Sequence, residues 1–410
     1  MSRRFPLILL LLLAFWVGAS YLQFSVFRLL MIALIGLVAA SFLHLMLARQ
    51  RVRILSPTSP NEVTRGQMLN VLFPVEVRLW LVPVQVMIKA WYGLNESVQK
   101  PMKRQLQVTA GPRETKTLVM QVEGRHCGRV EMDDIQIRLR DTFGLFYARL
   151  PGAKARFSHE ALVLPRFEVE TDIRDWAKDL LDEGEKARQR VDERTDEVDT
   201  IRHYRPGDTL KAIHWKLSSR QNKFIVKQYE MPKEVRFCLL TDPTLPLDRS
   251  MDLLQRDRML DQRDHILETM AGFVFFLLSN RMHATLVTFH PDKMVQKSMQ
   301  VDHLRHFRRQ LSLLPTEQNL PLGEQLLQEE RVDTYDYYLL QTTRLGEATV
   351  ARIKERMRST RGIMLVYHYA GQMEQDTADS LKSLTNAGVL VRTVPMPGRR
   401  EREVELNGQA

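Results

Sequence analysis

Cysteine is the scarcest reactive residue in this chain. Its 410 residues include two cysteines, Cys127 and Cys238, which lie far apart and form no CxxC pair. The sequence therefore indicates neither a disulfide framework nor a cysteine-ligated zinc site, and a reducing compartment is the simplest interpretation. Both thiols lie in strand-like surroundings, so we expect them to be buried and unreactive.

Internal repeats, low-complexity tracts and long stretches of disordered composition are also missing. Apolar residues make up 44% of the sequence, which is enough for packed cores. The length allows two or three domains. Positive charge, in contrast, is in excess: the net charge of +10 at pH 7 indicates an anionic neighbour, either the inner leaflet of a membrane or a nucleic acid.

Charged residues are almost absent from two runs near the N-terminus, Phe5 to Ser20 and Leu29 to Leu47. Each run approaches the roughly 20 residues that a helix needs to cross the hydrocarbon layer. A short link joins them, so residues 1–48 are predicted to form a transmembrane helical hairpin. A cleaved signal peptide is the alternative for the first run, but the second run follows at once and no clear Ala-x-Ala site separates the two.

The arginines around this hairpin predict its orientation. Two precede it, three follow it and one lies in the link: Arg3 and Arg4, then Arg49, Arg51 and Arg53, and Arg28. Because positive residues collect on the cytoplasmic side, both ends of the hairpin are expected to face the cytoplasm. We therefore predict a two-pass membrane protein, in contact with membrane lipid, whose soluble domains are cytoplasmic.

The remaining chain changes pattern between its two halves. Residues 61–165 alternate apolar and polar in short runs, which predicts a small antiparallel β-sandwich. Residues 235–396 alternate strand-like and helical runs, which predicts a mostly parallel, doubly wound α/β sheet. Residues 166–234 form a charged connector that ends in a basic segment, and residues 397–410 a flexible tail. The predicted fold class is multidomain, with a helical hairpin, a β-sandwich and an α/β domain.

The basic segment from Ile201 to Glu230 holds two His, one Trp, two Tyr and seven Lys or Arg. The run Arg205-Pro206-Gly207-Asp208 is typical of a turn, and its last residue is well placed as a helix N-cap. The apolar spacing after it predicts a short helix to about Gln221, which Asn222 ends in the left-handed conformation.

This segment closely resembles the signature of the bacterial domain-of-unknown-function 58 family. The matching positions are Tyr204, Arg205, Pro206, Gly207, Asp208, Ile213, His214, Trp215, Lys216, Ser219, Arg220, Val226 and Lys227. The run Asp141-Thr142-Phe143-Gly144-Leu145-Phe146 resembles that family's D-P-F-G-L-F element, with Thr142 in place of Pro. We expect its apolar side chains to plug one end of the sandwich, with Gly144 making the turn.

The resemblance implies a von Willebrand A-like domain for residues 235–396 and a bacterial inner-membrane location. It also implies two partner proteins, a MoxR-type AAA+ ATPase and a transglutaminase-like membrane protein. On this basis we expect a non-enzymatic, membrane-anchored adaptor or scaffold for the assembly or maintenance of membrane or envelope proteins. Whether the signature segment is a docking site or only a seam between domains stays open.

Metal-binding von Willebrand A domains surround Mg²⁺ with oxygens from an Asp-x-Ser-x-Ser loop, a later Thr and a later Asp. In this chain Asp242 and Thr244 fit the first and third positions of the loop, but Pro246 offers no oxygen at the fifth. The later loop, residues 318–320, has no Thr, and Gln341 stands where the Asp would be. We therefore predict a degenerate site without a metal, and no cofactor.

Two other functions would use the basic segment. A hydrolytic protein could use His203, Asp208, His214, Ser218 or Ser219 in acid–base or nucleophilic roles. However, His214 lies on the apolar stripe of the predicted helix, so we expect it and Trp215 to be packed. Catalysis is therefore not expected.

Nucleic-acid binding could use the basic residues together with Tyr204 and Trp215, since aromatic rings stack on bases. No recognised reader motif is present, and a membrane anchor already accounts for positive charge on the cytoplasmic side. We expect no nucleic acid, and keep both functions as alternatives.

Overall fold

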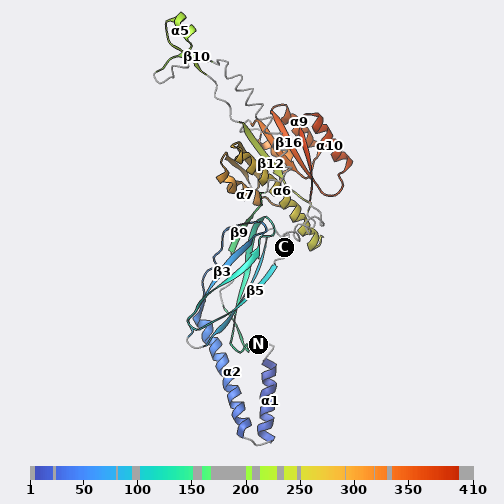
Figure 1. Cartoon of the computed structure of the whole chain (residues 1–410). Helices are drawn as coiled ribbons and strands as arrows, with labels where there is room; N and C mark the ends of the chain where they lie inside the picture. Colours follow the sequence, from blue (N-terminus) through green and yellow to red (C-terminus); the bar gives the residue numbers. More distant parts are fainter. Residues whose placement is uncertain are drawn as a thin grey trace, which may run out of the picture. The chain divides into compact units, whose positions relative to one another are not determined.

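The computed structural model describes residues 5–21, 25–79, 82–94, 102–150, 159–167, 200–205, 213–228, 235–246, 251–290, 292–317, 319–329 and 335–396. The chain divides into two compact units, shown in Figure 1. Unit 1 is Met1–Pro165 with Leu247–Asp264, and unit 2 is Arg166–Pro246 with His265–Ala410. The five segments expected from the sequence are finer than these units, so that division stays a prediction.

Unit 1 begins with two helices, α1 (Phe5–Tyr21) and α2 (Ser25–Arg51), which run side by side (Figure 1). Phe15 and Phe27 meet across them with ring centroids 6.5 Å apart. Among the described residues, Val26–Arg51 is long and apolar enough to cross a membrane, whereas the apolar part of α1 is shorter. The described residues thus contain one candidate membrane span, and the two-pass hairpin stays a prediction.

Two β-sheets follow in unit 1. The three-stranded sheet has the order β1-β3-β6; its strands are Val52–Ile54, Met68–Val77 and Thr115–Glu123. The other has the order β2-β9-β7-β4-β5, with β8 paired to β7; its strands are Glu62–Thr64, His159–Leu164, Gly128–Arg140, Val84–Leu94, Met102–Ala110 and, for β8, Tyr147–Arg149. Phe73 of β3, Ile88 of β4 and Ile137 of β7 belong to one core between the sheets.

The two facing sheets agree with the predicted sandwich, but one pairing differs from the prediction. β2 and β9 run parallel, with Glu62 opposite Leu162, so the larger sheet is mixed rather than purely antiparallel. The two strands come from opposite ends of the predicted segment, and neither is joined to the other by a hairpin. Antiparallel order was expected because hairpins connect neighbouring strands, and this rule does not apply here.

The element 141–146 is only partly packed as predicted. Gly144 has φ +73°, and a Cβ at this position would lie 2.2 Å from the guanidinium of Arg140, so the turn requires glycine. Leu145 is buried as expected. Phe143 was expected to plug the sandwich, but it is 50% exposed, because the turn directs Leu145 and not Phe143 inward.

Unit 2 is built on a six-stranded sheet of order β14-β13-β12-β15-β16-β17. Only the edge strand β14 is antiparallel to its neighbour. The strands, from β12 to β17, are Arg236–Asp242, His283–Phe289, Lys293–Ser298, Tyr337–Thr342, Gly362–Tyr369 and Leu390–Pro395. The helices are α6 (Leu253–Ser279), η2 (Val301–His303), α7 (Leu304–Ser312), α8 (Leu322–Glu329), α9 (Glu347–Met357) and α10 (Gln375–Asn386); the start of α6, up to Asp264, belongs to unit 1.

Helices cover both faces of this sheet, as the alternating pattern predicted. On one face, Cys238, Leu240 and Tyr338 share a core with side chains of α8, α9 and α10. On the other face, the Gln341 side chain donates a hydrogen bond to the Ile266 carbonyl of α6. Both cysteines are buried, and burial raises the pKa of Cys238 well above its usual value, so this thiol is unreactive as expected.

The basic segment forms a small motif of its own within unit 2. Strands β10 (Thr200–His203) and β11 (Ile225–Gln228) pair antiparallel, and helix α5 (Trp215–Gln221) lies between them in the sequence. The predicted turn residues Pro206, Gly207 and Asp208 lie outside the described residues.

Candidate functional site

The β10–α5–β11 motif has a very small interior. Ile213, Ile225 and Val226 are buried, and Ile213 forms an antiparallel bridge with Val226. The Ile225 backbone N–H donates to Ser218 Oγ at 2.9 Å, which ties helix α5 to strand β11. A two-stranded sheet with this little core is at most marginally stable by itself.

The helix begins later than the sequence predicted. Its N-cap is His214, whose ring Nδ1 accepts from the Leu217 N–H at 3.4 Å. The reason is the bridge made by Ile213, because a residue paired to β11 cannot be helical. The end of the helix was predicted correctly: Asn222 has φ 51° and ψ 30°, in the left-handed region.

Because α5 starts at Trp215, the predicted apolar stripe does not form, and the expectation that Trp215 is packed is wrong. Trp215 is 61% exposed and Phe224 is 58% exposed. The Phe224 ring lies 6.3 Å from the Trp215 ring and 6.1 Å from the Tyr204 ring, edge to face in both cases. Tyr204, Trp215 and Phe224 are called the aromatic cluster below.

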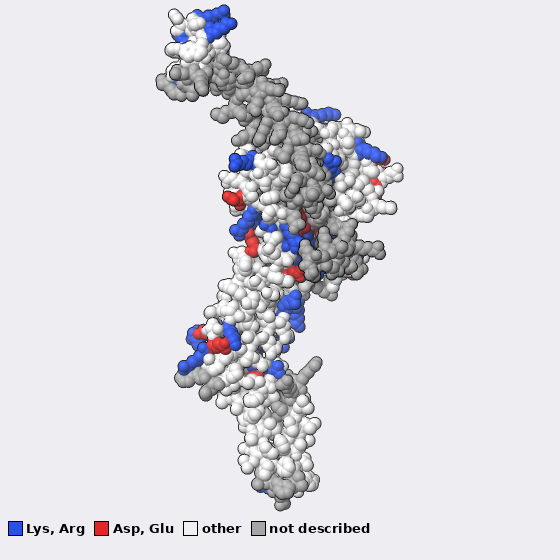
Figure 2. All heavy atoms as spheres, viewed as in Figure 1, with Lys and Arg blue, Asp and Glu red and all other residues white. Residues whose placement is uncertain are grey.

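Basic and polar signature residues surround the aromatic cluster. Those that are exposed are Arg205, Lys216, Ser219 and Arg220, together with Lys223, and Lys227 lies on β11 opposite Ile201. The described residues of the motif include no Asp or Glu. Figure 2 accordingly shows Lys and Arg, without acidic residues, on the motif face that it displays. The motif thus presents aromatic rings within a field of positive charge.

The motif does not bring together a nucleophile and a base within its described residues. Ser218 Oγ is hydrogen-bonded to backbone atoms of Ile225, and Ser219 Oγ donates to the Lys216 carbonyl at 3.2 Å. The Nδ1 of His214 is used as the helix cap. A triad-like arrangement would require a serine within hydrogen-bond reach of a histidine.

The residues predicted to form a degenerate metal site begin at the carboxyl end of β12. Asp242 is fully buried, and its Oδ1 accepts from Thr244 Oγ1 at 2.6 Å. Arg344 donates from Nε to Asp242 Oδ2 at 2.8 Å and from Nη2 to Oδ1 at 3.3 Å. The same Nη2 also donates to the Asn319 carbonyl at 3.0 Å. A guanidinium therefore stands where a metal ion bound to Asp242 and Thr244 would have to stand.

Gln341 does not belong to this group. Its side chain accepts from Thr241 Oγ1 at 3.1 Å and donates to the Ile266 carbonyl at 3.0 Å. It also contacts His368 Nε2 at 2.7 Å, and burial lowers the pKa of His368 to about 3, so this ring is neutral. The structure thus brings together two of the three predicted positions and places Gln341 in a separate buried polar network.

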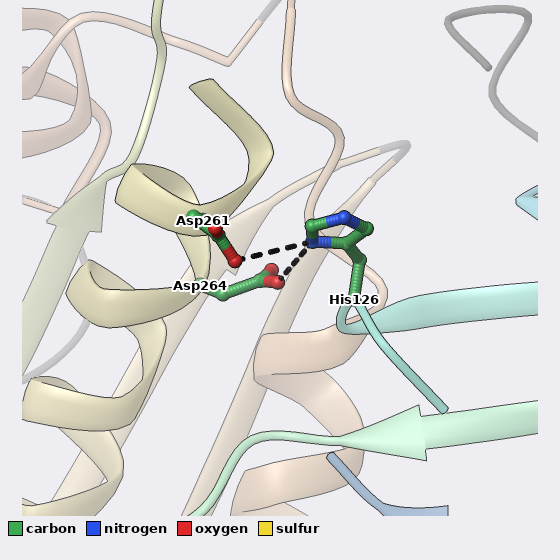
Figure 3. A group of neighbouring side chains, drawn as sticks. All are labelled: His126, Asp261 and Asp264. Atoms are coloured by element: carbon green, nitrogen blue, oxygen red, sulfur yellow. Dashed lines mark hydrogen bonds and ion pairs between the residues drawn. The ribbon is translucent and has the colours of Figure 1, made fainter. Parts of the chain in front are cut away.

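A third charged group was not anticipated from the sequence. His126, in the loop before β7, contacts three aspartates at the start of α6, all within unit 1. Its Nδ1 lies 2.9 Å from Asp264 Oδ2 and 3.8 Å from Asp261 Oδ1 (Figure 3), and its Nε2 lies 2.9 Å from Asp257 Oδ1. One signal was visible in the sequence: positions 257, 261 and 264 share one face of a helix.

The ligand atoms of His126, Asp261 and Asp264 lie within 4.8 Å of one another, as in a metal site. Arginines, however, already hold these carboxylates. Arg65 lies 2.6 Å from Asp261 and 3.2 Å from Asp264, and Arg263 lies 3.0 Å from Asp264. A cation would have to displace two guanidinium groups, so the donor set fits an ion-pair network better than a metal centre.

Both ring nitrogens of His126 face carboxylate oxygens, so both donate and the ring is an imidazolium. Burial alone would lower the pKa of His126, but its hydrogen bonds to Asp257 and Asp264 raise it above the ordinary value. Burial likewise opposes the charge on Asp264, yet Arg263, His126 and Arg65 together lower its pKa to about 2. We call His126, Asp257, Asp261 and Asp264, with Arg65, Arg125 and Arg263, the histidine network.

The family model described as "Protein of unknown function DUF58" matches residues 200–321, which include the β10–α5–β11 motif and the strands β12 to β14. This match confirms the family resemblance. No curated protein matches the chain.

Solved structures resemble the chain only weakly. The CARDB domain of a Pyrococcus furiosus protein is 13% identical, with a TM-score of 0.19 over 28% of this chain and 87% of its own. A β-glucosidase from Listeria innocua is 12% identical, with a TM-score of 0.20 over 27% of this chain and 16% of its own. The alkylpurine DNA glycosylase AlkC of Pseudomonas fluorescens is 15% identical, with a TM-score of 0.19 over 28% and 30%. Such scores carry no functional argument.

Proposed function

We propose that this chain, whose residues 200–321 match the family model described as "Protein of unknown function DUF58", is a non-enzymatic, membrane-anchored adaptor. Its docking surface is the β10–α5–β11 motif. The observation that carries the proposal is the exposure of Trp215 and Phe224 within the family segment.

The chemistry of the motif fits a protein partner. Exposed aromatic clusters rimmed by polar residues mark interaction sites, and Trp, Tyr and Arg dominate the binding energy of protein interfaces. Arg220, five residues after Trp215 in α5, can form a bidentate pair with a carboxylate. Because the described motif has no acidic residue, the partner surface is an acidic rim around an apolar pocket.

The partner that the family resemblance implies is a MoxR-type AAA+ ATPase. In this proposal the adaptor recruits the ATPase to the membrane, where it acts on membrane or envelope proteins and works beside a transglutaminase-like membrane protein. Recruitment needs only a docking surface and an anchor, and no catalytic residue.

The anchor in this proposal is a two-pass hairpin of α1 and α2 in the bacterial inner membrane. Its support is the apolar span Val26–Arg51 and the arginines Arg49 and Arg51 in the last turn of α2. By the positive-inside rule, that end and the units after it face the cytoplasm.

We assign the α/β part of unit 2 as a von Willebrand A-like domain without its metal. The assignment is supported by the early β13–β14 hairpin followed by helices α7 and α8. The Arg344 guanidinium at Asp242 supplies the positive charge that a metal would otherwise bring. Protein recognition then falls to the aromatic cluster.

Co-purification from detergent-solubilised bacterial membranes tests the proposal. The unsubstituted chain is expected to recover a AAA+ ATPase, identified by mass spectrometry. The double substitution Trp215→Ala and Phe224→Ala should lower recovery at least tenfold. Leu327→Ala, which also removes an exposed apolar side chain of unit 2, serves as the matched control and should leave recovery unchanged.

The two parts of the proposal fail separately. If the unsubstituted chain recovers no ATPase, the proposed partner is refuted. Equal recovery by the double variant and the control would remove the docking surface.

Nucleic-acid binding is the second candidate, favoured by exposed rings among basic residues. It predicts that a labelled single-stranded oligonucleotide binds the full chain with an affinity that falls steeply between 50 and 200 mM salt. Binding that is lost in the double variant, with no ATPase recovered, would favour this candidate over the adaptor. A hydrolytic role has no comparable observation among the described residues.

A further inference from the structure

The C-terminal part of α2 is packed into the soluble core of unit 1. Ser41, Leu45 and Ala48 of α2 are buried, at spacings that place them on one face of the helix, and Val52 at the start of β1 is buried as well. Leu45, Ala48 and Val52 belong to the same core as the two sheets. The helix therefore begins to contact the sandwich at about Ser41.

The opposite face of the same helix stays apolar beyond that point. Its exposed side chains include Phe42, Leu43, Met46 and Leu47, and the next charged residue of α2 after Arg28 is Arg49. From Val26 to Leu47 the helix is about 33 Å long at 1.5 Å per residue, which matches a hydrocarbon layer of about 30 Å. From Val26 to Ser41 it would reach only about 24 Å.

Two loops of the sandwich lie beside residues 41–44 of α2. We call residues 82–83 and 141–146 the tip loops. Ser41 Oγ donates to the Asp141 carboxylate, and the Phe42 and Phe146 rings meet edge to face at 5.6 Å. His44 Nε2 lies 3.3 Å from the Val82 carbonyl. Both tip loops are thus level with a part of α2 whose outer face is still apolar.

We infer that the tip loops lie within the interfacial layer of the lipid bilayer, with Phe143 as their inserted side chain. The inference rests on the membrane anchoring proposed above. Phe143 is 50% exposed and Val82 is 37% exposed. Both lie beside the exposed apolar face of α2, so the lipid that covers that face would also cover these two side chains. Tyr147, whose ring lies 5.6 Å from the Arg140 guanidinium, has the aromatic–basic character typical of membrane interfaces.

The acidic residue of the tip loops does not oppose this placement. Asp141 is fully buried, and its carboxylate accepts from the Phe146 N–H at 2.7 Å and the Phe143 N–H at 3.1 Å, in addition to Ser41 Oγ. Its charge is satisfied inside the protein. The loops present apolar and backbone groups outward together with the exposed Thr142, whose Oγ1 donates to the Pro83 carbonyl at 2.8 Å. Asp141 thus connects the 141–146 turn to α2 through its hydrogen bonds.

Spin labels on single introduced cysteines test the inference in the full chain, reconstituted into nanodiscs with anionic lipid. Because Cys127 and Cys238 are buried, the unsubstituted chain should take up no label. Labels are placed at Phe143→Cys and Val82→Cys on the tip loops and at Leu37→Cys on the lipid-facing side of α2. A label at Gln67→Cys marks the opposite end of β3, about 30 Å from the tip.

Power saturation with oxygen and with a water-soluble nickel chelate reports the depth of each label. Leu37→Cys should be accessible to oxygen, Gln67→Cys to nickel, and both tip-loop labels should give an intermediate depth. Tip-loop labels that match Gln67→Cys, with Leu37→Cys still in lipid, would overturn the inference but keep the anchor. Leu37→Cys exposed to nickel would refute the anchor itself, and tip-loop labels shielded from both reagents would indicate a protein cover instead of lipid.

Discussion

Asp242 in unit 2 and Asp264 in unit 1 are both fully buried carboxylates, yet the protein compensates their charges in different ways. Asp264 is held by Arg65, Arg263 and His126 together. Asp242 is held, among the described residues, by the Arg344 guanidinium, whose side chain is 44% exposed. The comparison shows that a histidine–aspartate cluster can have the spacing of a metal site and still have its negative charges balanced without a metal, because arginines pair with the carboxylates.

The largest effect is expected from Asp264→Asn, because it leaves two nearly buried guanidinium groups facing an amide. Breaking a buried ion pair on one side costs about 3–5 kcal/mol, so the urea midpoint of unit 1 should fall markedly. Asp379→Asn removes an exposed partner of Lys382 and should cost less than about 0.5 kcal/mol. Equal effects of the two substitutions would show that the histidine network does not stabilise the fold.

A smaller loss of stability is expected from Arg344→Met. Because the Arg344 side chain is 44% exposed, water can reach the Asp242 carboxylate once the guanidinium is removed. Losing hydrogen bonds to a charged group costs about 1.5–3 kcal/mol. The freed carboxylate and Thr244 Oγ1 should then bind a divalent ion, so millimolar Mg²⁺ should raise the melting temperature of the variant. Arg344→Lys keeps the charge and should show no Mg²⁺ response. A clear Mg²⁺ isotherm for the unsubstituted chain would contradict the assignment.

His126 should make unit 1 sensitive to alkaline pH. Its pKa is raised in the folded state, so its stabilising contribution is complete below about pH 6.5, the ordinary value, and is lost as pH rises through the folded-state pKa. Melting temperatures measured from pH 6 to 9 should decline, and His126→Gln should flatten the decline. A profile that is identical in both proteins would mean that another group titrates.

The smallest effect on stability is expected from Trp215→Ala. The side chain is mostly exposed and outside the buried interior of its motif, so the free energy of unfolding should change by less than about 0.5 kcal/mol. Circular dichroism during heating checks this. A large loss of stability would show that the aromatic cluster is packed against other parts of the protein, and would weaken its use as a docking surface.

The sequence was sufficient for features that depend on local pattern. The alternation of strands and helices in unit 2, the left-handed Asn222 and the turn at Gly144 all follow from spacing or from backbone preference. The pairing of Asp242 with Thr244 could also be predicted, because the two residues lie in the same short loop.

Long-range partners were beyond this reasoning. Arg344 lies 102 residues after Asp242, and Asp264 lies 138 residues after His126, so no spacing rule connects them. Arg344 could have been found, since it follows β15, the parallel neighbour of β12, and both strands end at the same edge of the sheet. Trp215 was misjudged because the start of its helix was set by the tertiary bridge at Ile213.

The buried stripe of α2 also bears on how the protein can be made. A chain that begins at Val52 would lack Leu45 and Ala48, which belong to the same core as the two sheets, so the residues that they cover would be exposed. The helices α1 and α2 therefore cannot be removed without consequence for the fold. Their removal would expose apolar surface of the sandwich core and favour aggregation. During synthesis, the sandwich can reach its final packing only once the preceding helix is in place.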